Sequence, residues 1–131
     1  MKIINLIFGA FLMIVFLITG WYMKEILRSE HLLDSTIRME LRANHIYILF
    51  ISLLNILSFK VKLSESIISK YCNITFRFLL VFAGLLAIAA FIYDHSGILE
   101  ERIITFYQII FSLVAIGAVA LNELSLMIKG K

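Results

Sequence analysis

Long apolar stretches alternate with short polar segments along the whole chain. The apolar stretches cover about residues 3–23, 43–59, 74–93 and 103–123. A helix that crosses a bilayer needs about 20 predominantly apolar residues. The first and fourth stretches meet this length directly, and the other two meet it once flanking basic side chains, Arg77 among them, reach toward the interface. The pattern therefore predicts an all-α membrane protein with four transmembrane helices.

The polar segments between these stretches are short and contain turn residues, as in Asp34-Ser35-Thr36 and Asp94-His95-Ser96-Gly97. Short connections make consecutive helices antiparallel neighbours. We therefore expect an up-down-up-down bundle that forms a single domain over residues 1–131. Residues 25–41 have apolar positions near helical spacing, so the first two helices are expected to extend past the membrane as a hairpin. An amphipathic segment on the membrane surface is the alternative.

The composition supports a membrane protein. Of the 131 residues, 62% are hydrophobic and 16% are charged, and the mean hydropathy is +1.00. Soluble domains carry roughly 45–50% apolar and about 25% charged residues. The net charge of +3 is small and the basic residues are scattered, so no nucleic-acid partner is expected.

The N-terminal stretch also resembles a signal peptide, because Lys2 precedes an apolar run. The run is longer than a usual signal-peptide core, and no A-x-A-like cleavage site precedes the next polar segment. We therefore expect this stretch to remain in the protein as its first span.

The distribution of basic residues predicts the orientation in the membrane. Four spans place both termini on one side, and seven of the 12 Lys and Arg residues fall on that side. By the positive-inside rule, the N- and C-termini are then cytoplasmic. The margin over the opposite side is narrow, so a dual topology stays open. The short, Lys-flanked start favours a bacterial inner (plasma) membrane.

Polar residues inside or at the edge of the spans predict contacts between helices, because hydrogen bonds help to hold helices together in lipid. We expect such contacts at Arg42, Asn44, His45, Asn55, Gln108, Ser112 and Asn122. In the fourth stretch, polar or small residues step by three or four positions and predict one inward face, formed by Thr105, Gln108, Ser112, Ala115, Val119 and Asn122. The alternative is that these polar groups line a path for a solute or ion.

Small residues predict where helices approach each other closely. The third stretch contains Ala83, Gly84, Ala87 and Ala90, and the fourth contains Ala115, Gly117, Ala118 and Ala120. We therefore expect the third and fourth helices to pack closely. The first helix offers Gly9 and Gly20 for a similar approach.

The three histidines are weak candidates for a metal site. His31, His45 and His95 all fall toward the outer side in the predicted topology, where carboxylates are also present. Their spacing matches no metal-binding motif. Only His45 falls inside a span, which argues against bis-His haem. We therefore expect no metal and no cofactor.

One face of the second helix carries Arg38, Arg42 and His45 at positions i, i+4 and i+7. We expect this stripe to form ion pairs with Glu100 or Glu101 at the start of the fourth helix. Contacts with anionic headgroups or with a partner subunit are the alternatives.

The spans contain no nucleophile–base pair, phosphate-binding loop or paired carboxylates, so we expect no catalytic residues and no enzymatic activity. Abundant packing residues and helices without proline favour a protein that assembles. We expect an accessory or assembly subunit of a membrane complex, or a homo-oligomer, whose partners are lipid and other membrane subunits or copies of itself. The alternative is a small transporter or channel with a polar path lined by amides of the second and fourth helices.

Overall fold

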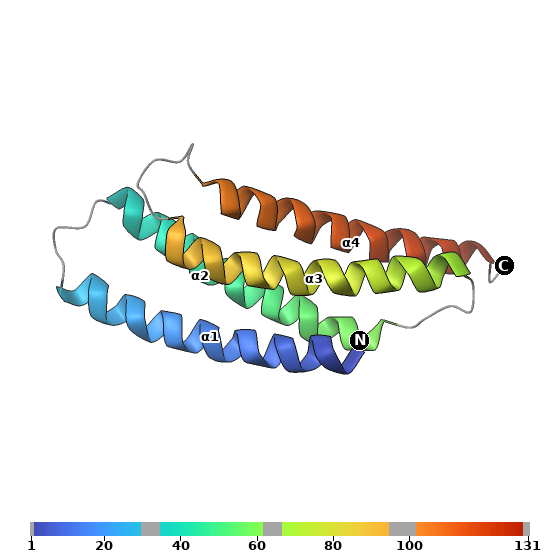
Figure 1. Cartoon of the computed structure of the whole chain (residues 1–131), viewed down its shortest axis with the longest axis horizontal. Helices are drawn as coiled ribbons and strands as arrows, with labels where there is room; N and C mark the ends of the chain where they lie inside the picture. The colour runs from blue at the N-terminus through green and yellow to red at the C-terminus, as the bar shows by residue number, and fades with distance from the viewer. Residues whose placement is uncertain (1, 30–34, 62–66, 95–101, 130–131) are drawn as a thin grey trace.

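The structure is a computed structural model that describes residues 2–29, 35–61, 67–94 and 102–129. This part of the chain is almost entirely helical and contains no strand. It consists of α1 (Lys2–Ser29), α2 (Ser35–Leu57), the short 3-10 helix η1 (Ser58–Lys60), α3 (Ile67–Tyr93) and α4 (Ile103–Lys129) (Figure 1). The all-α prediction is confirmed.

All four long helices have the length and apolar composition needed to cross a membrane. The segments that qualify are Lys2–Glu25, Ser35–Lys60, Lys70–Tyr93 and Ile103–Leu124. Each predicted apolar stretch lies inside one of these segments. The helices also continue beyond the stretches, as expected for the first two, because α1 reaches Ser29 and α2 begins at Ser35.

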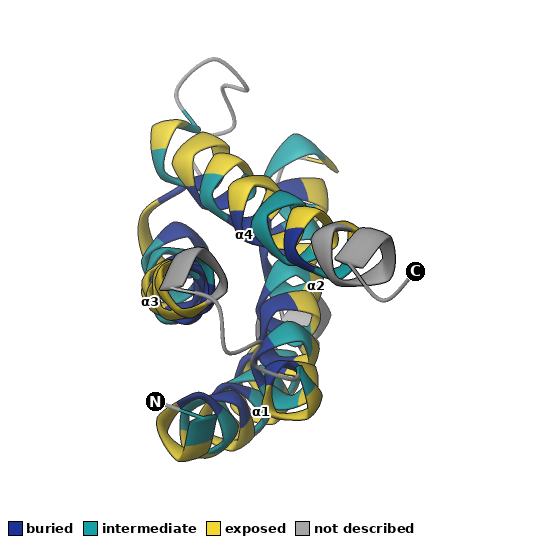
Figure 2. Ribbon diagram, turned by 90° about the vertical axis from the view of Figure 1, so that its right-hand side faces the viewer, coloured by how far each residue is buried: buried dark blue, intermediate teal, exposed yellow. Residues whose placement is uncertain are grey.

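Consecutive helices lie against each other. The most extensive contacts join α1 to α2 and α3 to α4, and α2 also packs along α3. In Figure 2, α1 and α4 lie at opposite ends of the assembly, with α2 and α3 between them. The outer helices α1 and α4 therefore each have one main neighbour.

The distribution of side chains is the reverse of that in a soluble protein. Among the described residues, the buried set holds fourteen polar or charged side chains and twelve apolar ones. Large apolar side chains are exposed on all four helices, including Ile7, Trp21, Phe50, Phe78 and Leu113. Figure 2 shows exposed positions, in yellow, along all four helices. Such a surface is unfavourable in water and favourable in lipid, where buried polar groups hold helices together.

The apolar core consists of three clusters along the bundle. The first joins α1, α2 and α3 through Met23, Leu41, Ile48, Ala87 and Phe91. The second joins the same helices through Leu12, Ile51 and Ala83. The third joins α3 to α4 through Phe76, Leu80 and Ala115.

The prediction that α3 and α4 pack closely is confirmed, since these two helices share the most extensive contacts, but the small residues of α3 also contact other helices. Ala83 and Ala87 of α3 belong to the clusters shared with α1 and α2. A Cβ built on Gly84 would meet the side chains of Phe8 and Leu12 on α1. The reason is geometric: α3 has neighbours on two sides, and its small face contacts α1 and α2, while larger side chains contact α4.

The predicted inward face of α4 is confirmed. Thr105, Gln108, Ser112, Ala115 and Asn122 are buried, and Val119 is half-buried. On the other side of the helix, a Cβ built on Gly117 would meet no atom of another described helix within 4 Å.

Candidate functional site

The first group of buried polar residues, which we call the Arg77 cluster, consists of Asn5, Asn55, Ser58, Asn73 and Arg77. The Arg77 side chain is only 2% exposed. Its Nε donates to Asn73 Oδ1 at 2.5 Å, and its Nη2 donates to the Ser58 carbonyl at 2.9 Å. Among the described residues, none of its hydrogen-bond partners is a carboxylate.

The position of Ser58 explains how this buried cation is stabilised. Ser58 lies where α2 gives way to η1, so its carbonyl is at the end of a helix, where the dipole is negative. This carbonyl accepts one hydrogen bond from the Val61 backbone N–H at 3.3 Å and a second, shorter one from Arg77 of α3, whose positive charge meets the partial negative charge. Arg77 therefore binds at the end of α2 inside the bundle; that it also reaches toward the membrane interface stays a prediction.

Two asparagines connect this cluster to α1 and to the backbone of α3. Asn5 Nδ2 lies 3.0 Å from Asn55 Oδ1 and 3.0 Å from the Arg77 carbonyl. Asn55 Nδ2 lies 3.0 Å from the Ile51 carbonyl and 3.2 Å from the Leu80 carbonyl. The cluster thus joins α1, α2 and α3 by hydrogen bonds.

The second group, which we call the Asp94 cluster, consists of Asn44, Asp94, Arg102 and Thr105. Asp94 Oδ2 accepts hydrogen bonds from the Thr105 backbone N–H at 2.7 Å and from its hydroxyl at 2.8 Å. Thr105 lies in the first turn of α4, where N–H groups lack intrahelical partners and the dipole is positive. The Asp94 carboxylate therefore caps α4 from the end of α3.

Asn44 of α2 completes the Asp94 cluster. Its Nδ2 lies 3.0 Å from the Ala90 carbonyl and 3.1 Å from the Asp94 carbonyl, so it caps the C-terminal end of α3. Arg102 Nη2 donates to Asn44 Oδ1. The cluster thus joins α2, α3 and α4.

His45 contacts α1, away from either cluster. Its ring stacks on Phe16, with centroids 4.1 Å apart, and its Nδ1 lies 2.9 Å from Thr19 Oγ1. A Cβ built on Gly20 would lie 3.1 Å from the ring, so the glycine permits this close approach. The other two candidate metal ligands, His31 and His95, lie outside the described residues. Within the described helices, no three His, Cys, Asp or Glu side chains come together.

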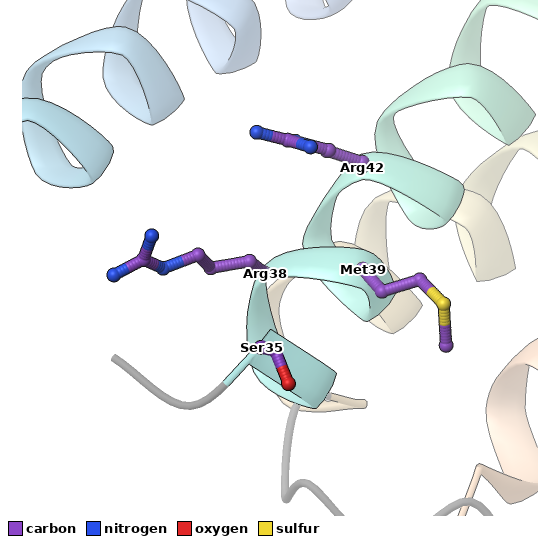
Figure 3. Close-up of a pocket in the computed structure, with 4 residues that line it drawn as sticks. All are labelled: Ser35, Arg38, Met39 and Arg42. Carbon is purple, nitrogen blue, oxygen red and sulfur yellow. The ribbon is translucent and has the colours of Figure 1, made fainter. Parts of the chain in front are cut away.

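Arg38 and Arg42 line a surface depression at the start of α2. The depression has a volume of about 360 Å³ and is bounded by Ser35, Arg38, Met39 and Arg42. Both arginine side chains extend to one side of the helix, and Met39 extends to the other (Figure 3). Two guanidinium groups one turn apart suit an anionic group. The predicted partners Glu100 and Glu101 lie outside the described residues.

A cleft between α2 and α4 contains two more of the predicted polar contacts. It has a volume of about 150 Å³ and is lined by Tyr47, Phe50, Gln108, Ser112 and neighbouring apolar residues. Ser112 Oγ donates to the Gln108 carbonyl at 2.7 Å, within its own helix. The Gln108 side-chain oxygen is buried and has no hydrogen-bond donor among the described residues.

The seven predicted contact residues are therefore distributed over several places. Asn44 and Asn55 lie in different clusters, Gln108 and Ser112 line the α2–α4 cleft, and His45 contacts α1. Arg42 is exposed. Asn122 is buried and lines a small hollow that Asn73 also borders.

The sequence reasoning did not identify Asn5, Asn73, Asp94, Arg102 and Thr105 as members of polar clusters. One signal was present for Asn5, which is the only amide in the first apolar stretch. Asp94 resembled a turn residue, and its capping role depends on where α4 begins. The chain was also compared with known proteins, and no family model, curated protein or solved structure matches it.

Proposed function

We propose that the chain is a multi-pass protein of a bacterial inner (plasma) membrane, with four helices arranged up-down-up-down and both termini in the cytoplasm. The apolar outer surface and polar interior support the membrane location. The pairing of sequence positions supports the alternating helix direction. Between α1 and α2, Asn5 is hydrogen-bonded to Asn55 and Thr19 to His45. Between α2 and α3, Asn44 is hydrogen-bonded to the Ala90 carbonyl and Asn55 to the Leu80 carbonyl. In each pair of helices, the residue number rises along one helix as it falls along the other.

Within the membrane, the protein acts as a non-enzymatic accessory or assembly subunit, bound to other membrane subunits or to copies of itself. The observation that carries this proposal is the outward side of α4. A Cβ built on Gly117 would meet no atom of another described helix within 4 Å, and Gly117 lies in a membrane-length helix. Small residues in membrane helices are used where another helix approaches closely. Because α4 has only α3 as a main neighbour, a partner helix has access to this position.

The hydrogen bonds of the polar interior favour an assembly subunit over a transporter or channel. Asn44 and Asn55, which the alternative assigns to a solute path, donate hydrogen bonds to backbone carbonyls of α3. Gln108 and Ser112 face a separate cleft. The amides therefore act mainly as helix-to-helix contacts. Liposome flux provides the test, because flux that falls when Asn55 and Gln108 are replaced by leucine would favour a channel or transporter.

The assembly proposal is tested by extracting the native membrane with a styrene–maleic acid copolymer and measuring the particle's protein mass. We expect a mass above the 15.1 kDa of one chain, from further copies or from a partner. Gly117→Leu is expected to reduce that mass toward one chain. Ala10→Leu, a matched change at an exposed small residue on α1, should leave it unchanged. A wild-type particle with one chain and no partner would contradict the proposal.

The topology is tested separately by thiol labelling. The single cysteine, Cys72, is first replaced by serine, and one new cysteine is then introduced at Lys131 or Leu32. We expect a membrane-impermeant reagent to label only the cysteine at position 32 from the outer side. Labelling of both positions, or of neither, in intact cells would contradict the proposed arrangement.

A further inference from the structure

The surface depression at the start of α2, which we call the arginine depression, concentrates positive charge. It has a volume of about 360 Å³ and is bounded by Ser35, Arg38, Met39 and Arg42, none of which is acidic. Both arginine side chains extend to the same side of α2 (Figure 3). Because α2 begins at Ser35 without an acidic residue in its first turn, the positive end of the helix dipole adds to this charge.

Arg42 is available to bind a ligand at this depression. Its side chain is exposed, and it forms no hydrogen bond or ion pair with another described residue. A guanidinium group presents paired N–H donors that match the oxygens of a phosphate or a carboxylate. An anion with several oxygens therefore suits both the charge and the donors of the depression.

Contacts between α1 and α2 indicate the depth of Arg42 in the membrane. The Thr19 hydroxyl lies 2.9 Å from His45 Nδ1. In the antiparallel arrangement proposed above, Arg42, which precedes His45 by three residues, lies level with Tyr22 and its neighbour Trp21. Both aromatic side chains are exposed. Exposed tryptophan and tyrosine favour the headgroup level of a bilayer, so Arg42 is expected at that level.

An exposed tyrosine of α3 indicates the same depth. Asn44 Nδ2 lies 3.1 Å from the Asp94 carbonyl, which brings the preceding residue, Tyr93, close to the level of Arg42. Tyr93 is 72% exposed. Arg38 is four residues nearer the start of α2 and therefore lies about 6 Å further out along the helix. The two arginines thus extend outward from the aromatic level, where the phosphate groups of a bilayer lie.

We propose that the arginine depression binds the phosphate of an anionic phospholipid. The guanidinium groups of Arg38 and Arg42 donate to the phosphate oxygens, and the acyl chains lie against the apolar outer surface of the bundle. A zwitterionic headgroup binds more weakly, because the arginines repel its ammonium group. A free phosphate ester lacks acyl chains that hold it at this level. The site goes beyond the assembly function and rests on the membrane location and helix arrangement proposed above.

The test compares dioleoylphosphatidylglycerol with dioleoylphosphatidylcholine, which share their acyl chains and differ in headgroup charge. Glycerol 3-phosphate serves as the free phosphate ester. The protein is purified in an uncharged detergent, and its thermal midpoint is measured against the concentration of each probe, because a ligand that binds the folded state raises the midpoint. We expect the anionic lipid to bind about tenfold more tightly than the zwitterionic one, and the free ester to cause no shift at the same concentrations.

Four variants locate the binding. Arg42→Gln and Arg38→Gln should each weaken the anionic lipid about fivefold, as the loss of one basic side chain near a lipid surface implies. Arg42→Lys keeps the charge without the paired donors and should retain part of the affinity. Lys24→Gln is the matched control, because Lys24 is an exposed cation at the same end of the bundle that does not line the depression. It should leave the affinity unchanged.

Equal affinities of the wild-type protein for the two lipids would overturn the proposal. Equal losses in Arg42→Gln and Lys24→Gln would do the same, because attraction would then depend on the overall charge of this end of the bundle. A shift from glycerol 3-phosphate as large as that from the anionic lipid would exclude a lipid as the specific ligand. Circular dichroism establishes that each variant is folded. Whether the chain needs detergent for extraction tests the membrane location separately, so the two failures are distinguishable.

Discussion

The Arg77 and Asp94 clusters each stabilise a buried charged side chain at the end of a helix, and the two charges are opposite. Arg77 lies at the C-terminal end of α2, where the helix dipole is negative, and Asp94 lies at the N-terminal end of α4, where it is positive. Each charge reaches a helix other than its own and forms a hydrogen bond with a backbone group at the end of that helix. Helix ends thus make a charged side chain acceptable inside an apolar bundle.

The two clusters differ in how the charge is surrounded. Arg77 is bound by neutral oxygens, from the Ser58 carbonyl and Asn73, whereas the Asp94 cluster contains a second charged residue, Arg102. The Arg77 cluster joins α1, α2 and α3, and the Asp94 cluster joins α2, α3 and α4. The two clusters together therefore link all four helices, and this division predicts which substitution weakens which part.

The largest effect is expected from Arg77→Met, which keeps the apolar stem but removes the cation. Asn73 Oδ1 would lose the Arg77 donor and the Ser58 carbonyl would keep only the Val61 N–H. Hydrogen bonds from charged groups are worth more than neutral ones. We expect a loss of about 3 kcal/mol in the free energy of unfolding. SDS titration in mixed micelles measures it.

Arg42→Met is the matched control for Arg77, because Arg42 is exposed. It should change stability little. Equal losses for the two variants would show that the cation itself, wherever it lies, is what matters, and would remove the distinction between buried and exposed arginine.

A smaller effect is expected from Asp94→Ala, which leaves the first turn of α4 without its cap. Loss of a capping side chain typically costs about 1 kcal/mol. Because Asp94 also binds the Thr105 hydroxyl, we expect a loss somewhat above that value. Hydrogen exchange should increase at the start of α4 and remain unchanged near Arg77.

Asp94→Asn separates charge from hydrogen bonding in the same cluster, because it keeps an acceptor oxygen. We expect it to retain about half of the stabilisation, with the remainder due to attraction between the carboxylate and the helix dipole. If Asp94→Asn and Asp94→Ala lose the same free energy of unfolding, the charge of Asp94, and not its hydrogen-bond geometry, would account for the whole effect.

The smallest effect is expected between the two clusters, where α1 approaches α2 at Gly9. The Gly9 carbonyl accepts a hydrogen bond from Ser52 Oγ at 2.8 Å, and an added Cβ would lie 3.0 Å from two backbone atoms of α2. Gly9→Ala should therefore cost about 1 kcal/mol. Gly117→Ala, at a position where an added Cβ meets no other helix of the same chain, should leave the unfolding of the single chain neutral or slightly stabilised, since alanine favours helices. Unfolding in detergent compares the two.

The helices could be predicted from the sequence because their determinant is local. An uncharged apolar run of about 20 residues needs no knowledge of the rest of the chain to be identified as a membrane-length helix. The inward face of α4 was predictable for the same reason, since Thr105, Gln108, Ser112 and Asn122 follow the period of a helix.

The polar clusters could not be predicted because their partners lie far apart in the chain. Asn5 and Asn55 are separated by 50 positions, and Asn44 and Asp94 by 50 positions as well. The position of Arg77 near the start of an apolar stretch is typical of an arginine at a membrane interface. Its burial depends on the Ser58 carbonyl at the end of α2, which the sequence near Arg77 does not reveal. The small residues correctly predicted the close packing of α3 and α4, but their spacing does not specify which neighbouring helix each side of α3 meets.

The Arg77 cluster has a consequence for the order of membrane insertion during synthesis. The residues that accompany Arg77, from Asn5 to Asn73, all precede it in the chain. An arginine that enters lipid alone is costly. If the helices enter a membrane in the order of their synthesis, Asn5, Asn55 and Ser58 on the α1–α2 hairpin are in place before α3 brings Asn73 and Arg77 to them.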